Sequence, residues 1–173
     1  TVAGCHGTPA LVVPVLAGIL GSGASDELRK NAAFWIGQQN DAQGLALLAR
    51  TARQDRSEEV REGAVFAISQ IELPAAVDEI IGLARSAEKR DVRKQAVFWL
   101  GQMASERSGR ALEEFARKDT DTEIQEQAVF ALSQLPDDQG GDALIKLKPS
   151  GEHRFRRVRP DVRLRCAPEP CRT

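Results

Sequence analysis

The residue types that most often bind metals or act as nucleophiles are scarce in this chain and lie near its two ends. Cys5 and His6 are adjacent near the N-terminus, and His153, Cys166 and Cys171 lie near the C-terminus. Neither group has a sensible metal-ligand spacing on a rigid element, and no nucleophile stands beside a plausible base. The sequence therefore predicts no metal site, no cofactor and no catalytic residue, so we expect a protein that is not an enzyme.

Three glycines could indicate a second chemistry, the binding of phosphate. Gly18, Gly21 and Gly23 are close together, but a phosphate-binding loop follows a β-strand, whereas these glycines follow a helical pattern. We therefore expect no phosphate loop. No apolar run approaches the ~20 residues that a membrane-spanning helix needs.

The distribution of charge argues against nucleic acid as a partner. From Pro149 onward there are seven Arg against three acidic residues, a net charge of +4. The rest of the chain then holds 17 basic (24 − 7) and 22 acidic (25 − 3) residues, a net charge of −5. Nucleic-acid binding rests on neutralising phosphates with Lys and Arg, and an acidic body does not supply such a surface.

One pattern of eleven residues occurs four times, at a constant spacing of 32 residues. It reads LRKNAAFWIGQ from Leu28, VREGAVFAISQ from Val60, VRKQAVFWLGQ from Val92 and IQEQAVFALSQ from Ile124. A repeat of this length is typical of a solenoid, in which each unit buries its apolar face against its neighbours. We therefore expect an all-α fold, an α-solenoid.

A second, weaker apolar pattern with the same period lies between the four copies and completes pairs of helices. The predicted pairs are residues 9–22 with 26–39, 42–54 with 58–71, 74–87 with 90–104, and 107–118 with 122–135, followed by a lone helix at 139–148. Ser25-Asp26, Ser57-Glu58 and Asp121-Thr122 are typical N-terminal helix signals. Pro9 and Pro74 suit a first helical turn, and Pro14 is expected to kink the first helix.

The four copies resemble the second helix of HEAT repeats, in the short bacterial form that is also found in phycobilisome-lyase-like proteins. The resemblance covers about residues 9–148 and implies a right-handed superhelix of about four and a half helix pairs, with the second helices on its concave side. In that family an Arg near the start of the second helix bonds to a neighbouring acidic group. Arg29, Arg61 and Arg93 occupy this position, and Gln125 departs from it, so we expect the ladder to weaken there.

The resemblance implies a non-catalytic scaffold that binds a protein or peptide partner on its concave helix face. The alternative function is that of a phycobilin lyase-like or lyase-accessory protein. The iron-binding HEAT hydroxylases carry His-Glu pairs on their helices, which this sequence lacks, and the HEAT-like DNA glycosylases would need a basic concave face.

A finer alternation makes the unit a double repeat of 64 residues. The third position of the pattern reads Lys30, Glu62, Lys94 and Glu126, the eighth Trp35, Ala67, Trp99 and Ala131, and the tenth Gly37, Ser69, Gly101 and Ser133. We interpret Trp35 and Trp99 as structural, each opposing an Ala on the next helix, with Gly making room for the ring. The alternation of Lys and Glu would place opposite charges on adjacent helices.

One face of the repeated helix carries an aromatic residue in every copy. At about 100° per residue, the seventh position lies almost opposite the apolar core face. It is occupied by Phe34, Phe66, Phe98 and Phe130, and the nearby eleventh position by Gln38, Gln70, Gln102 and Gln134. Asn31, Gly63, Gln95 and Gln127 lie at the fourth position beside them. The stripe is either a partner-binding groove or a surface buried between stacked helices.

The chain divides into an N-terminal tail (1–8), a repeat array (9–148) and an Arg- and Pro-rich segment (149–173) that we expect to be disordered or a non-native terminus. The start at Thr1 suggests a processed product or a fragment. The residues before Cys5 are similar to a bacterial lipobox but lack the hydrophobic part of a signal peptide, which leaves cytoplasm and periplasm open. The apolar last helix has no partner, so we expect self-association through uncapped ends.

Overall fold

The structure is a computed structural model and describes residues 9–135, which form eight helices. They are α1 (Pro9–Leu20), α2 (Asp26–Gly37), α3 (Ala42–Gln54), α4 (Glu58–Ser69), α5 (Pro74–Ser86), α6 (Arg90–Met103), α7 (Glu106–Lys118) and α8 (Thr122–Ser133). All eight helices predicted in this range are present, with small differences at their ends. The helix expected at 139–148 and the segments 1–8 and 149–173 lie outside the described residues.

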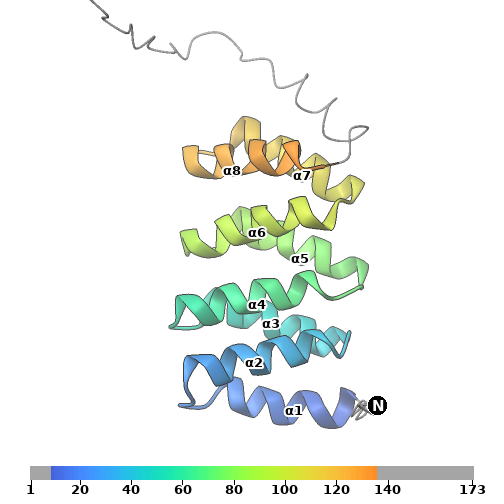
Figure 1. Ribbon diagram of the computed structural model, residues 1–173, viewed down its shortest axis with the longest axis vertical. Coiled ribbons are helices and arrows are strands. Elements are labelled where there is room, and N and C mark those ends of the chain that lie inside the picture. The colour runs from blue at the N-terminus through green and yellow to red at the C-terminus, as the bar shows by residue number, and fades with distance from the viewer. Residues whose placement is uncertain (1–8, 136–173) are drawn as a thin grey trace, which may run out of the picture.

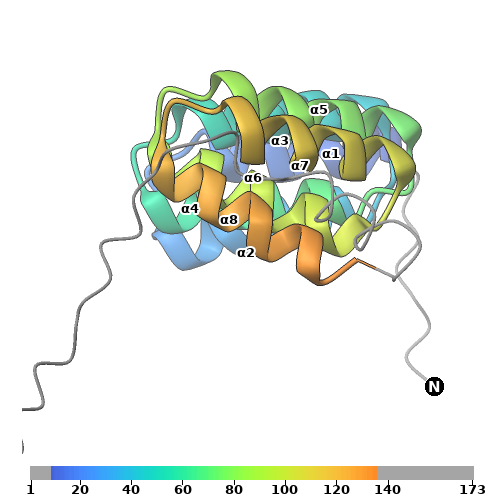
Figure 2. The same ribbon diagram turned by 90° about the horizontal axis from the view of Figure 1, so that it is seen from above.

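The helices stack as consecutive pairs, which confirms the all-α solenoid (Figure 1). Figure 2 shows α1, α3, α5 and α7 on one side of the stack and α2, α4, α6 and α8 on the other. We call these the odd row and the even row. Neighbouring helices of the even row pack directly on one another, whereas those of the odd row barely touch. The closer spacing makes the even row the inner side of the stack, while the handedness of the superhelix stays a prediction.

The core is a continuous apolar layer between the two rows. Leu48, Ile80 and Leu112, one per odd helix, are fully buried, and so are Val92 and Ile124 at the first position of the pattern. Each pair contributes the same positions because the 32-residue period places them at the same height and on the same face. The core therefore extends along the stack without a break between pairs.

Most helix ends follow the predicted signals. The Ser25 side chain accepts a hydrogen bond from the Leu28 amide, and Asp121 accepts one from the Glu123 amide. Ser57 lies at the N-cap of α4 but makes no capping hydrogen bond with its side chain. Pro74 occupies the first turn of α5. The helix α1 runs unbroken through Pro14.

Contacts along the even row alternate between two kinds, and they differ from those expected for the Trp residues. A Cβ added to Gly37 would lie 2.6 Å from the Ala67 carbonyl oxygen, so Gly37 allows α2 to approach the α4 backbone closely. Gly101 faces Ala131 in the same way between α6 and α8. Trp99 instead contacts Phe66 across the α4–α6 junction, with ring centroids 5.0 Å apart. Small residues thus face small ones, and Trp does not oppose Ala.

The expected ion pairs between the alternating Lys and Glu residues are also replaced by other contacts. Lys94 binds Glu123 at 3.1 Å, and Glu62 accepts a hydrogen bond from the Gln95 amide at 3.2 Å. Within residues 9–135, Lys30 and Glu126 form no ion pair. The Lys30 stem lies against Gly63, where an added Cβ would meet its Cγ at 2.6 Å. The alternation therefore serves packing at this position.

Candidate functional site: a groove along the even row

Two adjacent hollows lie on the surface of the even row. The first, about 270 Å³, is lined by Lys30, Glu59, Glu62, Gly63, Phe66, Gln95 and Trp99. The second, about 230 Å³, is lined by Lys94, Gln95, Phe98 and Gln127. Gln95 belongs to both, so the hollows join into one shallow depression that crosses from α2 to α8. We call this depression the even-row groove.

Aromatic rings form the apolar part of the even-row groove. The Phe34 and Phe66 rings are nearly parallel, with centroids 6.2 Å apart, and Phe66 also contacts Trp99. Phe98 meets Trp99 edge to face, with centroids 5.1 Å apart. Phe34, Phe66 and Phe98 are half-buried, and Phe130 on α8 is 53% exposed. The stripe therefore combines both sequence interpretations, since its rings pack sideways on each other and still present surface to solvent.

The glutamines expected beside these rings do not line the groove. Gln38, Gln70, Gln102 and Gln134 are exposed at the C-terminal ends of the even helices. Three of them are C-cap residues, of α2, α4 and α8. The amides in the hollows are Gln95 and Gln127, from the fourth position of the pattern. That position lies one helical turn before the Phe of the same helix, which is the sequence signal that could have identified it.

The arginines of the pattern form a ladder of ion pairs at the N-terminal ends of the even helices. Arg29 binds Asp26 at 2.6 Å and also Asp55, while Arg61 binds Asp91 at 2.6 Å. A hydrogen bond from Arg29 lowers the pKa of the Asp26 carboxyl, and the same bond raises the pKa of Arg29. The ladder links consecutive pairs and lies outside the groove.

The ladder changes towards α8. Arg93 binds Asp119, whose side chain is mostly buried, at 2.5 Å. Gln125 donates a hydrogen bond to the Asp119 carbonyl at 2.7 Å, as Arg61 does to the Asp55 carbonyl at 2.9 Å. Gln125 therefore keeps the backbone contact of the ladder and lacks its charge.

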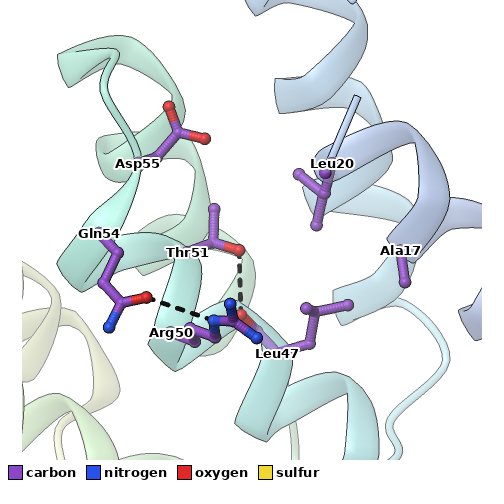
Figure 3. A pocket seen from close by; sticks show the side chains of 8 residues that line it. Ala17, Leu20, Leu47, Arg50, Thr51, Gln54 and Asp55 are labelled. Atoms are coloured by element: carbon purple, nitrogen blue, oxygen red, sulfur yellow. Dashed lines mark hydrogen bonds between the residues drawn. The ribbon is translucent and has the colours of Figure 1, made fainter. Parts of the chain in front are cut away.

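A separate hollow of about 480 Å³ lies in the odd row between α1 and α3 (Figure 3). At the next two junctions the end of an odd helix carries an arginine that reaches an acidic residue, Arg53 to Glu79 and Arg85 to Glu114. The corresponding residue at the end of α1 is Gly21, one period before Arg53. The missing side chain leaves the space open, and Arg50 there donates to Gln54 at 3.3 Å.

Two further classes of site can be assessed for residues 9–135. In this range no group of three or more His, Cys, Asp or Glu side chains is placed to hold a metal ion. None of its helices has both the length and the hydrophobicity needed to span a membrane.

Comparison with known proteins places these features in context. A family model for HEAT repeats matches residues 13–95 and 77–159. No curated protein matches the sequence. The fold is similar to the solved structure of human deoxyhypusine hydroxylase in complex with glycerol, with a TM-score of 0.57 and 22% sequence identity. The match covers 70% of this chain and 42% of that protein, so the chain spans less than half of its length.

Proposed function

Because this chain belongs to the HEAT-repeat family, whose repeats generally serve as protein-interaction scaffolds, we propose that it is a non-catalytic scaffold that binds a protein partner in the even-row groove. The partner segment is an extended peptide or one amphipathic helix. The observation that carries the proposal is the continuity of the groove, since Gln95 lines both of its hollows.

The shape and chemistry of the groove support this class of partner. The groove is shallow and open, and it crosses several helices, which suits a long segment better than a small molecule enclosed in a pocket. Half-buried rings of Phe66, Phe98 and Trp99 offer apolar contact along it. The side chains of Gln95 and Gln127 offer hydrogen-bond donors and acceptors to a peptide backbone.

The residue types present support a binding role in preference to catalysis. Residues 9–135 contain no His and no Cys, the side chains most used as catalytic bases, nucleophiles and metal ligands. The groove contains charges of both signs, Lys30 and Lys94 with Glu59 and Glu62. Such a surface suits a partner of mixed charge and gives no concentrated field for an anion or a cation.

The test is a crosslinked pull-down analysed by mass spectrometry, with variants on the two rows. Phe98→Ser removes an aromatic ring of the groove, and Arg50→Ser changes the odd row as a matched control. We expect one or more proteins that the parent and Arg50→Ser recover equally, and that Phe98→Ser recovers about tenfold less or not at all. Equal recovery by all three proteins would contradict the proposal.

A second measurement locates binding on the groove itself. Trp99 lines the groove and Trp35 does not, so a Trp35→Phe variant reports through Trp99 alone. Titration with a peptide from the recovered partner should shift the emission of Trp99 with the affinity found in the pull-down. An unchanged emission at saturating peptide would place the binding site elsewhere. A new absorption band on mixing with a bilin would instead support the lyase-like alternative.

A further inference from the structure

The exposed large apolar side chains of residues 9–135 are confined to the two ends of the stack. Four of the six lie on the first helix pair and two on the last described helix; they are Leu11, Val15, Leu28, Trp35, Val129 and Phe130. Figure 1 shows α2 and α8 near opposite ends of the column. Exposed apolar surface gathered in one place marks an interaction site more often than scattered residues do.

The junction between α4 and α6, in the middle of the stack, shows how such surfaces fit together. Phe66 of α4 contacts Trp99 of α6, and Val65 and Val92 are fully buried. The Gln95 amide of α6 donates to the Glu62 carboxylate of α4 at 3.2 Å. This junction therefore combines an aromatic pair, buried valines and one polar contact.

The two ends of the stack repeat the two sides of this junction. Phe130 and Val129 of α8 lie 64 residues after Phe66 and Val65 of α4. Phe130 is 53% exposed and Val129 41% exposed, whereas Val65 is fully buried. The end of the stack at α8 thus presents the same residues that α4 presents to α6.

The same holds for α2, which repeats the α6 side. Trp35 and Leu28 lie 64 residues before Trp99 and Val92. Trp35 is 56% exposed and Leu28 49% exposed, whereas Val92 is fully buried. The 64-residue alternation therefore begins at α2 with the α6 type of helix and reaches α8 with the α4 type, so the two ends are complementary.

The polar residues of the junction are preserved in part. Glu126 of α8 corresponds to Glu62, and Asn31 of α2 corresponds to Gln95, so the amide-to-carboxylate contact can form. Gln125 and Glu27 correspond to Arg61 and Asp91. The ion pair of the central junction thus becomes a neutral amide facing a carboxylate, which can still form a hydrogen bond. No like charges meet at these positions.

We propose that α8 of one copy of this chain receives α2 of a second copy, head to tail, in the arrangement that α4 and α6 have within the chain. The contact pairs Phe130 of one copy with Trp35 of the next. It joins two different surfaces, so it leaves one free α2 and one free α8 on every assembly and is open-ended. Association therefore continues beyond a dimer as the concentration rises.

Sedimentation of the full chain over a hundredfold range of concentration tests the association. We expect the average mass to rise through dimers to larger species. Trp35→Ser damages only the α2 end and Phe130→Ser only the α8 end. Each variant alone should self-associate about tenfold more weakly, because aromatic anchors carry much of the energy of such contacts.

An equimolar mixture of the two variants tests the head-to-tail arrangement. The intact α2 end of Phe130→Ser can dock on the intact α8 end of Trp35→Ser, after which only damaged ends remain. The mixture should therefore form a heterodimer of nearly wild-type affinity and nothing larger. A contact between two like ends would instead let one of the variants self-associate as the parent does, and that result would overturn the proposal.

Two further results would also overturn it. One is a full chain that stays monomeric over the whole range, which would mean that no second copy docks on α8. The other is a mixture that associates no better than its components. Leu28→Asn and Val129→Asn repeat the experiment with smaller exposed residues, in case a Trp or Phe variant misfolds. Gln70→Ser, exposed in the middle of the stack, is the control and should associate like the parent.

Discussion

Gly37 of α2 lies so close to Ala67 of α4 that a Cβ on the glycine would approach the Ala67 carbonyl oxygen to 2.6 Å. Real Cβ atoms do not come this close to a backbone oxygen, so only glycine permits this spacing of the two helices. The same relationship recurs between Gly101 and Ala131, and it separates the tight junctions of the even row from the wider one that holds Trp99.

We expect Gly37→Ala to destabilise the protein, because the backbone of α4 cannot move aside as a side chain can. The expected loss is about 1–3 kcal/mol in the free energy of unfolding, the usual cost of overpacking, measured by urea denaturation. Gly63→Ala is the matched control. A Cβ on Gly63 meets only the flexible Lys30 stem, and alanine favours the helix by about 1 kcal/mol. Equal losses for the two variants would contradict this account.

The phenylalanines of the groove should differ in their contribution to folding. Phe66 contacts both Phe34 and Trp99, whereas Phe98 contacts Trp99 alone. Full burial of Phe makes truncation cost about 3–5 kcal/mol, and both residues are half-buried. We expect losses of about 2 kcal/mol for Phe66→Ser and about 1 kcal/mol for Phe98→Ser by urea denaturation. A larger loss for Phe98→Ser than for Phe66→Ser would show that the ring contacts do not govern the difference.

Arg61 allows the ion pair of the ladder to be separated from its backbone contacts. Its guanidinium binds Asp91 and also donates to the Asp55 and Arg56 carbonyls. Arg61→Gln recreates the situation of Gln125, which keeps a carbonyl contact without charge. We expect about 1 kcal/mol of lost stability for Arg61→Gln and about 2–3 kcal/mol for Arg61→Ala, which also leaves the carbonyls unpaired. Indistinguishable denaturation curves for the two variants would show that the carbonyl contacts contribute nothing.

Stability should depend on pH through the contact between Arg90 and Asp121. Hydrogen bonds from Arg90, at 2.6 and 2.7 Å, lower the pKa of the Asp121 carboxyl from 3.8 to about 2. A depressed pKa in the folded state means that this contact stabilises the protein above the unfolded pKa of 3.8, and that the contribution is lost as the pH falls towards 2.

The measurement is a series of thermal melts from pH 6 to pH 2, a range that spans both pKa values. The difference in Tm between the parent and Arg90→Gln should be constant above about pH 5 and shrink between about pH 4 and pH 2. Lys118→Gln is the control, since Lys118 makes no ion pair within residues 9–135. A difference that stays constant down to pH 2 would rule out Asp121 as the titrating group.

The sequence by itself determined the helix pairs and their stacking. Four copies at a spacing of 32 residues place Val60, Val92 and Ile124 at equivalent positions, and repeated burial of such positions leaves few ways to arrange the helices. The start signals at Ser25 and Asp121 are local, because each involves a side chain and an amide only two or three residues away. Such features can be predicted from residue types and spacing alone.

The tertiary structure decided which surfaces meet and which stay open. The roles of Trp99 and Gly37 depend on the separation of helices 32 residues apart, which the pattern within one helix does not contain. For the same reason the groove takes its amides from Gln95 and Gln127 and not from the expected Gln70 and Gln102. Exposure of Trp35 and Phe130 likewise follows from their place at the ends of the stack, since their equivalents Trp99 and Phe66 have the same residue types and are half-buried between neighbouring helices.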